Sequence, residues 1–136
     1  MNKIVIDSCV YVSHFGIDKL TPKSKAFFKR ISQTDTQIIL PALVEAEVLV
    51  VLHQNGATRL DKISQLFSQM IFSPLNKELI RGLTSFIESN QSSLKTSDLI
   101  IALTAKLNDA ALITWDKQLL GSNICETASP ENYRGP

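Results

Sequence analysis

The chain has 136 residues, 44% of them hydrophobic and 20% charged, which is typical of one globular domain and excludes a wholly disordered chain. Its 14 basic and 13 acidic residues leave a formal charge of +1, so binding to nucleic acid would need a local basic patch. Two cysteines, Cys9 and Cys125, are too few and too far apart for a disulfide framework or a zinc site. No signal peptide is recognisable and no apolar run approaches the roughly 20 residues that cross a bilayer, so we expect a soluble, cytoplasmic protein without a membrane segment.

The first part of the chain alternates short apolar runs with helical patterns. Ile4–Ile6 predicts a buried strand, and Thr21–Pro22 is typical of a helix start with threonine as the N-cap. Gln37–Leu40 predicts a second strand, closed by a proline. The helical pattern that starts at Ala42 ends at Asn55–Gly56, a common C-terminal signal.

The second part continues the alternation. Thr58–Asp61 matches a capping box at the start of a helix with a strong apolar stripe. The stripe consists of Leu60, Ile63, Leu66, Phe67, Met70 and Ile71. Further elements are predicted as a brief strand at 71–72, a helix at 77–89, a helix from 96 to near 108, a strand at 110–114 and a last strand at 123–125.

Alternating strands and helices favour a three-layer α/β/α fold with a central parallel sheet of four to five strands. We expect a single domain over residues 1–136, with the tail from about residue 128 loosely held. In such sheets ligands bind outside the carboxyl ends of the strands, so the residues that follow each strand are candidates for a functional site.

Four acidic residues occupy positions that could converge at this edge. Asp7 and Asp116 follow predicted strands, Asp98 lies in the first turn of a helix, and Glu47 lies in the helix after the second strand. Each has a plain structural explanation when taken alone, as a cap, a turn residue or a carboxylate that favours a helix N-terminus.

Glu47 is the least easily explained by structure alone. The residues around it are apolar on nearly every side, so we expect this helix to be buried, and a buried glutamate needs a partner or a metal. Glu45 lies two positions earlier, about 200° around the helix, so only one of the two can face a given site. We choose Glu47 for the site.

These positions together resemble the PIN domain family of metal-dependent ribonucleases. The similar segments are residues 4–10, 39–48, 96–105 and 112–119, each containing one of the four acids, with spacings of 40, 51 and 18 residues between them. Residues 129–133 are similar to the closing segment of the family. Cys9 departs from the family pattern, in which Asn or Ser is common at this position.

The resemblance implies a Mg²⁺- or Mn²⁺-dependent ribonuclease. Asp7, Glu47, Asp98 and Asp116 would be the catalytic residues and metal ligands, because carboxylate oxygens suit these hard cations. Ser8 and Thr114 would donate hydrogen bonds to these carboxylates and so hold them in place. Lys95 and Lys117 are candidates for contact with the substrate, although each is equally explained as a solvated surface charge.

Stand-alone PIN domains of this size are similar to the toxins of VapBC-type toxin–antitoxin pairs. That likeness implies an RNA substrate, a homodimer and an antitoxin whose segment covers the acidic groove. Dimerisation would use a helix face such as Leu60, Ile63, Phe67 and Met70, although the same stripe is also typical of a core. The alternative is a PIN-like domain that binds RNA or a partner without catalysis.

Overall fold

The computed structural model describes residues 2–135 and has the alternating element order of an α/β protein. Its strands are β1 (Lys3–Ile6), β2 (Gln37–Pro41), β3 (Ile71–Ser73), β4 (Ala111–Ile113) and β5 (Thr127–Ala128). Its helices are α1 (Ser8–Phe15), α2 (Thr21–Ser32), α3 (Ala42–Gln54), α4 (Leu60–Phe67), α5 (Lys77–Ser89), α6 (Thr96–Leu107) and α7 (Lys117–Leu120).

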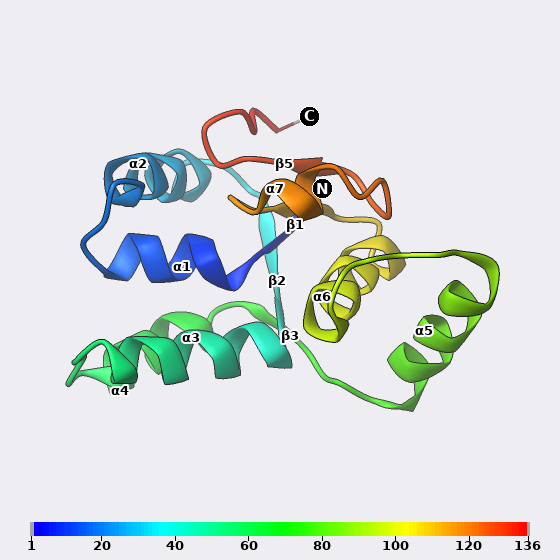
Figure 1. Cartoon of the computed structure of the whole chain (residues 1–136). Helices are drawn as coiled ribbons and strands as arrows, with labels where there is room; N and C mark the ends of the chain where they lie inside the picture. The colour runs from blue at the N-terminus through cyan, green and yellow to red at the C-terminus, as the bar shows by residue number, and fades with distance from the viewer. Residues whose placement is uncertain (1, 136) are drawn as a thin grey trace.

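The five strands form one parallel sheet in the order β3-β2-β1-β4-β5. Helices α1 to α4 lie on one side of the sheet and α5 and α6 on the other (Figure 1). This arrangement confirms the predicted three-layer α/β/α fold. The central strand β1 pairs with β2 on one edge and β4 on the other, with Ile4 opposite Ile38 and Ala111.

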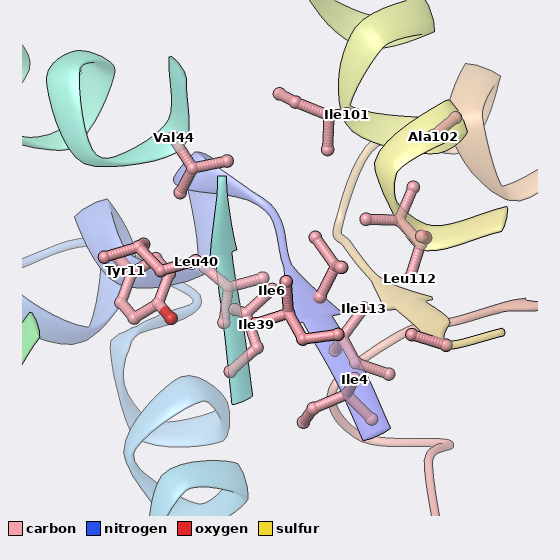
Figure 2. Packing of buried hydrophobic residues seen from close by; sticks show 14 of the residues in the cluster. Ile4, Ile6, Tyr11, Ile39, Leu40, Val44, Ile101, Ala102, Leu112 and Ile113 are labelled. Carbon is pink, nitrogen blue, oxygen red and sulfur yellow. The ribbon is translucent and has the colours of Figure 1, made fainter. Parts of the chain in front are cut away.

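The core lies on both faces of the sheet. Figure 2 shows Tyr11 of α1 and Val44 of α3 on one side of β1 and β2, and Ile101 and Ala102 of α6 on the other. All four side chains are buried. A strand covered in this way on both faces carries consecutive apolar residues, as the run Ile4–Ile6 does.

Helix α1 is the main element that the sequence pattern does not predict. Val10, Tyr11 and Val12 have modest helix propensity, so the segment lacks a helical signature of its own. Packing supplies the stability instead, because Val10 and Tyr11 are both fully buried. Asp7 is the N-cap of this helix, and its side chain accepts a hydrogen bond from the Ser8 backbone amide.

Two predicted helix caps are wrong. The residue at the N-cap of α2 is Leu20, and Thr21 lies inside the helix, where its hydroxyl donates to the Ser13 carbonyl oxygen at 2.6 Å. Helix α4 begins at Leu60 without a side-chain cap, so Thr58 forms no capping box. Asp61 pairs instead with Arg59, at 3.2 Å.

The last predicted strand is also wrong in position. Residues 123–125 do not form a strand, because Asn123 has φ of 58°, in the left-handed region that extended backbone excludes. The strand β5 follows two residues later, at Thr127–Ala128.

Two expectations about exposure need correction. The stripe on α4 is not a free dimerisation face, because Ile63 and Phe67 are buried in the core, only 8% and 2% exposed. Helix α3 is not buried all round, because Val50 is 53% exposed. An apolar pattern on every side of a helix does not distinguish a core position from an exposed apolar one.

The segment after β5 makes specific contacts with α2. Arg30 Nη2 donates to the Pro130 carbonyl oxygen at 2.6 Å, and Lys23 pairs with Glu131 at 2.8 Å. The ring of Tyr133 lies 6.4 Å from that of Phe27. The prediction that the tail from about residue 128 is loosely held concerns its motion, and it stays a prediction. Over residues 2–135 no helix is long and apolar enough to cross a membrane.

Candidate functional site

The site lies where the chain reverses its direction across the sheet. From β1 the chain proceeds to β2 and β3, then returns past β1 to β4 and β5. The carboxyl ends of β1 and β4 are therefore neighbours whose following segments diverge, which is the usual place for a ligand in such sheets. Asp7 follows β1, and Thr114, Trp115 and Asp116 follow β4.

Asp7 is held by hydrogen bonds on both carboxylate oxygens. Oδ1 accepts from the Ser8 backbone amide at 2.8 Å, and Oδ2 accepts from the Thr114 hydroxyl at 2.7 Å. The Ser8 hydroxyl lies 3.5 Å from Oδ1, so the amide of Ser8 is its stronger donor. With 5% exposure, the carboxylate has a fixed position at the end of β1.

Thr114 links Asp7 to Asp116. Its fully buried hydroxyl donates to Asp7 and accepts from the Asp116 backbone amide at 3.0 Å. Asp116 in turn begins α7, with Oδ1 accepting from the amides of Gln118 at 2.8 Å and Leu119 at 3.3 Å. Within residues 2–135, Oδ2 of Asp116 accepts no hydrogen bond, so one oxygen holds the helix start and the other is free.

Glu47 and Asp98 approach from two helices on opposite sides of the sheet. Glu47 Oε1 is buried and has no hydrogen-bond partner among residues 2–135, which is unfavourable for a carboxylate. Burial raises the pKa of Glu47, the charges of Asp7 and Asp98 raise it further, and Lys95 opposes them. Burial likewise raises the pKa of Asp98, with Asp7 and Asp116 adding to the shift and Lys95 opposing it.

The structure thus brings the four predicted acids to the carboxyl edge of the sheet, close enough for their charges to affect one another. Glu47 is half-buried as a residue, less than expected, but the oxygen that lacks a partner is buried. Of the two predicted lysines, Lys95 acts on both Glu47 and Asp98. Lys117 is exposed at the start of α7.

Comparison with known proteins places this geometry in a family. The family model for the PIN domain matches residues 4–121. The chain belongs to the PIN domain family. A search of curated protein sequences found no match.

Several solved structures share the fold over most of this chain. A toxin–antitoxin complex from Klebsiella pneumoniae contains a chain that is 19% identical, with a TM-score of 0.70 over 93% of this chain and 97% of that one. VapC20 of Mycobacterium tuberculosis, described as a toxin that cleaves the sarcin–ricin loop, is 9% identical, with a TM-score of 0.70 over 90% and 98%. FitAcB from Neisseria gonorrhoeae is 16% identical, with a TM-score of 0.70 over 96% and 99%. At these identities the likeness shows the fold.

The side chain of Cys9 is part of this PIN domain site, and sequence reasoning assigned it no role. Its thiol donates to Asp7 Oδ2 at 3.4 Å and lies 3.5 Å from the Thr114 hydroxyl. Burial, followed by the charge of Asp7, raises the pKa of the Cys9 thiol to about 12, so the thiol stays protonated and acts as a weak donor. The position of Cys9 two residues after Asp7, in the first turn of α1, is the signal that could have identified it.

The donor set of this PIN domain site suits a hydrated divalent cation. Over residues 2–135 no three Asp, Glu, His or Cys side chains are gathered tightly enough to hold an ion by themselves. Burial, followed by the charges of the neighbouring acids and opposed by Lys95, raises the pKa values of Glu47 and Asp98, so a bound cation would favour their charged forms. A cation that keeps several of its water molecules needs only some direct ligands, and the partnerless Glu47 Oε1 is suited to such contact.

Proposed function

We propose that this chain is a metal-dependent endoribonuclease that hydrolyses phosphodiester bonds of RNA. The observation that carries the proposal is the convergence of Asp7, Glu47, Asp98 and Asp116 at one sheet edge, with a buried Glu47 oxygen that lacks a partner. Mg²⁺ or Mn²⁺ fits these hard oxygen donors. An RNA substrate would place this activity in the cytoplasm.

The residues have distinct parts in this reaction. A bound divalent cation would activate a water molecule and neutralise charge on the phosphate. Asp7 keeps its position because Thr114 and the Ser8 amide hold both of its oxygens. Oδ1 of Asp116 accepts a backbone amide at the start of α7, which leaves Oδ2 for the cation or its water molecules. The charge of Lys95 lowers the pKa of both Glu47 and Asp98, and Lys95 would attract a phosphate oxygen of the substrate.

The test is cleavage of structured and unstructured RNA in parallel with Mg²⁺, Mn²⁺ or EDTA. We expect cleavage with a divalent metal only, and its loss in Asp7→Asn, Asp98→Asn and Asp116→Asn. Asp109→Asn is the matched control, because Asp109 is exposed, lies outside the site and has φ of 53°, which Asn tolerates. Full activity in two of the three site variants would refute the assignment. RNA binding by wild type without cleavage in any metal would favour the non-catalytic alternative.

We further propose that the chain is the toxin of a type II toxin–antitoxin pair. The support is the shared fold with chains of toxin–antitoxin complexes, among them the one from Klebsiella pneumoniae. The cognate antitoxin would cover the acidic site with one of its segments. Induced expression in bacteria should arrest growth, whereas Asp7→Asn should not. Equal growth of cells that express either protein would contradict the toxin role.

A homodimer is the expected oligomeric state, and the exposed apolar residues in and after β3 support it. Ile71, Phe72, Leu75 and Ile80 lie within ten residues of the chain and are each between 44% and 55% exposed, an exposure of large apolar side chains that a partner surface would remove. Phe72→Glu should convert the dimer to a monomer in light scattering. Val50→Glu, which changes an exposed apolar residue on α3 in the same way, is the control. A monomeric wild type would refute this part of the proposal.

A further inference from the structure

Positive charge is concentrated on one helix of a nearly neutral chain. Residues 19–32 carry five basic and no acidic side chains, which are Lys19, Lys23, Lys25, Lys29 and Arg30. The rest of the chain has nine basic and 13 acidic residues, a net charge of −4. The formal charge of +1 is therefore the sum of a basic segment, made up of Lys19 and α2, and an acidic remainder.

The basic residues of α2 lie on its outer surface. Ser24, Phe27 and Ile31 bury the inner side of the helix, whereas Lys25 and Lys29 are exposed. Lys25 and Lys29 are four residues apart and therefore lie on the same side of the helix, one turn apart. In the part of the chain that the structure describes, neither has a carboxylate within 4.0 Å.

The C-terminal segment extends this positive surface. Lys23 and Arg30 of α2 line a groove with Arg134, Asn132 and Glu131 of the C-terminal segment. Figure 1 shows this segment passing near α2. Arg30 and Arg134 each donate from one nitrogen to a backbone carbonyl, Pro130 and Glu131 respectively, at 2.6 Å. These bonds leave further N–H groups of both guanidinium groups available to an anion. Among the described residues that line this groove, Glu131 is the one acidic side chain, and it pairs with Lys23.

A direct contact joins α2 to the acidic site. The Trp115 indole nitrogen donates to the Ser24 hydroxyl at 2.9 Å, and Trp115 lies between Thr114 and Asp116 in the chain. A site with four carboxylates repels phosphate groups, so affinity for RNA requires cations elsewhere on the molecule. Helix α2 carries the largest group of basic residues and reaches the edge of the site.

We propose that α2, together with residues 130–134, binds the phosphate backbone of a single-stranded segment of the RNA whose cleaved bond lies at the acidic site. This inference rests on the proposed ribonuclease function for the identity of the ligand. Binding to α2 would be independent of base sequence, because lysine contacts phosphate as a point charge. Sequence preference would then come from contacts nearer to the acids.

The test is the affinity of a fluorescent single-stranded RNA of 20 nucleotides, measured by anisotropy in EDTA at several salt concentrations. We expect Lys25→Gln/Lys29→Gln to weaken binding on the order of tenfold at low salt, and to make the slope of log affinity against log salt shallower by about 1.4. Lys62→Gln/Lys77→Gln is the matched control. It removes the same charge from two exposed lysines of α4 and α5 and should change affinity by less than threefold.

Equal losses in the two double variants, or no loss in either, would overturn the proposal. Wild type that fails to bind RNA at low salt would overturn it too, and would leave an acidic protein as the occupant of α2. A dinucleotide substrate separates this inference from the nuclease proposal, since it is too short to extend from the acidic site to Lys25 and Lys29 on the outer side of α2. Its kcat/KM should be unchanged in Lys25→Gln/Lys29→Gln. If RNA binding depends on α2 but no substrate is cleaved, the ribonuclease proposal is wrong and the proposed binding surface on α2 is retained.

Discussion

Replacing Thr114 by Val tests whether the site is held in place by the bridge between Asp7 and Asp116. Valine keeps the branched shape but removes the hydroxyl that donates to Asp7 Oδ2 at 2.7 Å and accepts from the Asp116 amide at 3.0 Å. A hydrogen bond to a charged group contributes about 1.5–3 kcal/mol and a neutral one about 1 kcal/mol. The additional buried methyl group offsets about 0.8 kcal/mol of this loss.

The free energy of unfolding should therefore fall by about 2–3 kcal/mol, which for a domain of this size lowers Tm by roughly 8–12 °C. Urea denaturation and thermal melts in EDTA measure the change. RNA cleavage should fall in parallel, because Asp7 loses the donor that orients it.

Thr104→Val is the matched control. Thr104 is also buried, at 1% exposure, but its hydroxyl donates to the Ile100 carbonyl oxygen of its own helix at 2.8 Å. That carbonyl keeps its backbone partner, so the control should change stability by no more than about 0.5 kcal/mol. If Thr114→Val is no more destabilising than Thr104→Val, the bridge does not hold the site. Coupling in a double-mutant cycle with Asp7→Asn would isolate the bond to the carboxylate.

Three other measurements test the acids and the tail. Asp98→Asn should melt higher than wild type in EDTA at pH 8, because burial, with Asp7 and Asp116, raises the pKa of Asp98 and its charged form destabilises the fold. This advantage should shrink as the pH falls through the raised pKa, and added Mg²⁺ should raise the Tm of wild type more than that of the variant; a lower melt in EDTA would make Asp98 a structural cap. Glu47→Gln should reduce kcat/KM for RNA on the order of a hundredfold and Glu45→Gln by less than threefold, and the reverse ranking would show that the wrong acid was chosen. Amide hydrogen exchange should be faster at Asn132 and Tyr133 than within α2 if the tail is loosely held, and equal protection would contradict this.

The positions of the acids were predictable because strand ends are marked strongly in this sequence. Ile4–Ile6 and the run that ends at Thr114 are apolar segments closed by a polar residue, and parallel pairing brings such ends to one edge. Helix geometry indicates that only one of Glu45 and Glu47 can face the site, the resemblance to the PIN family favours Glu47, and its role in the site stays a prediction. The role of Thr114 in holding the acids could also be predicted from the sequence, since Thr114 precedes Asp116 by only two residues.

Other features depend on tertiary contacts that a local pattern does not contain. Helix α1 forms because Val10 and Tyr11 are buried against its neighbours, against the preference of its residues. Strand β5 has two residues, too few to show any periodic pattern. The strand predicted instead at 123–125 does not form, because Asn123 has a positive φ. The contact from Trp115 to Ser24 spans 91 residues of sequence and leaves no trace in either segment.

The central place of β1 delays the appearance of a complete site during synthesis. The hydroxyl that orients Asp7 belongs to Thr114, which is made 107 residues after it. At typical ribosomal rates these residues are added over about 5–20 s. During this time β1 lacks its partner β4, and Asp116 does not yet exist. A nascent chain or a truncation product that lacks β4 and Asp116 therefore has no assembled acidic centre, so the proposed chemistry cannot begin before both have been made.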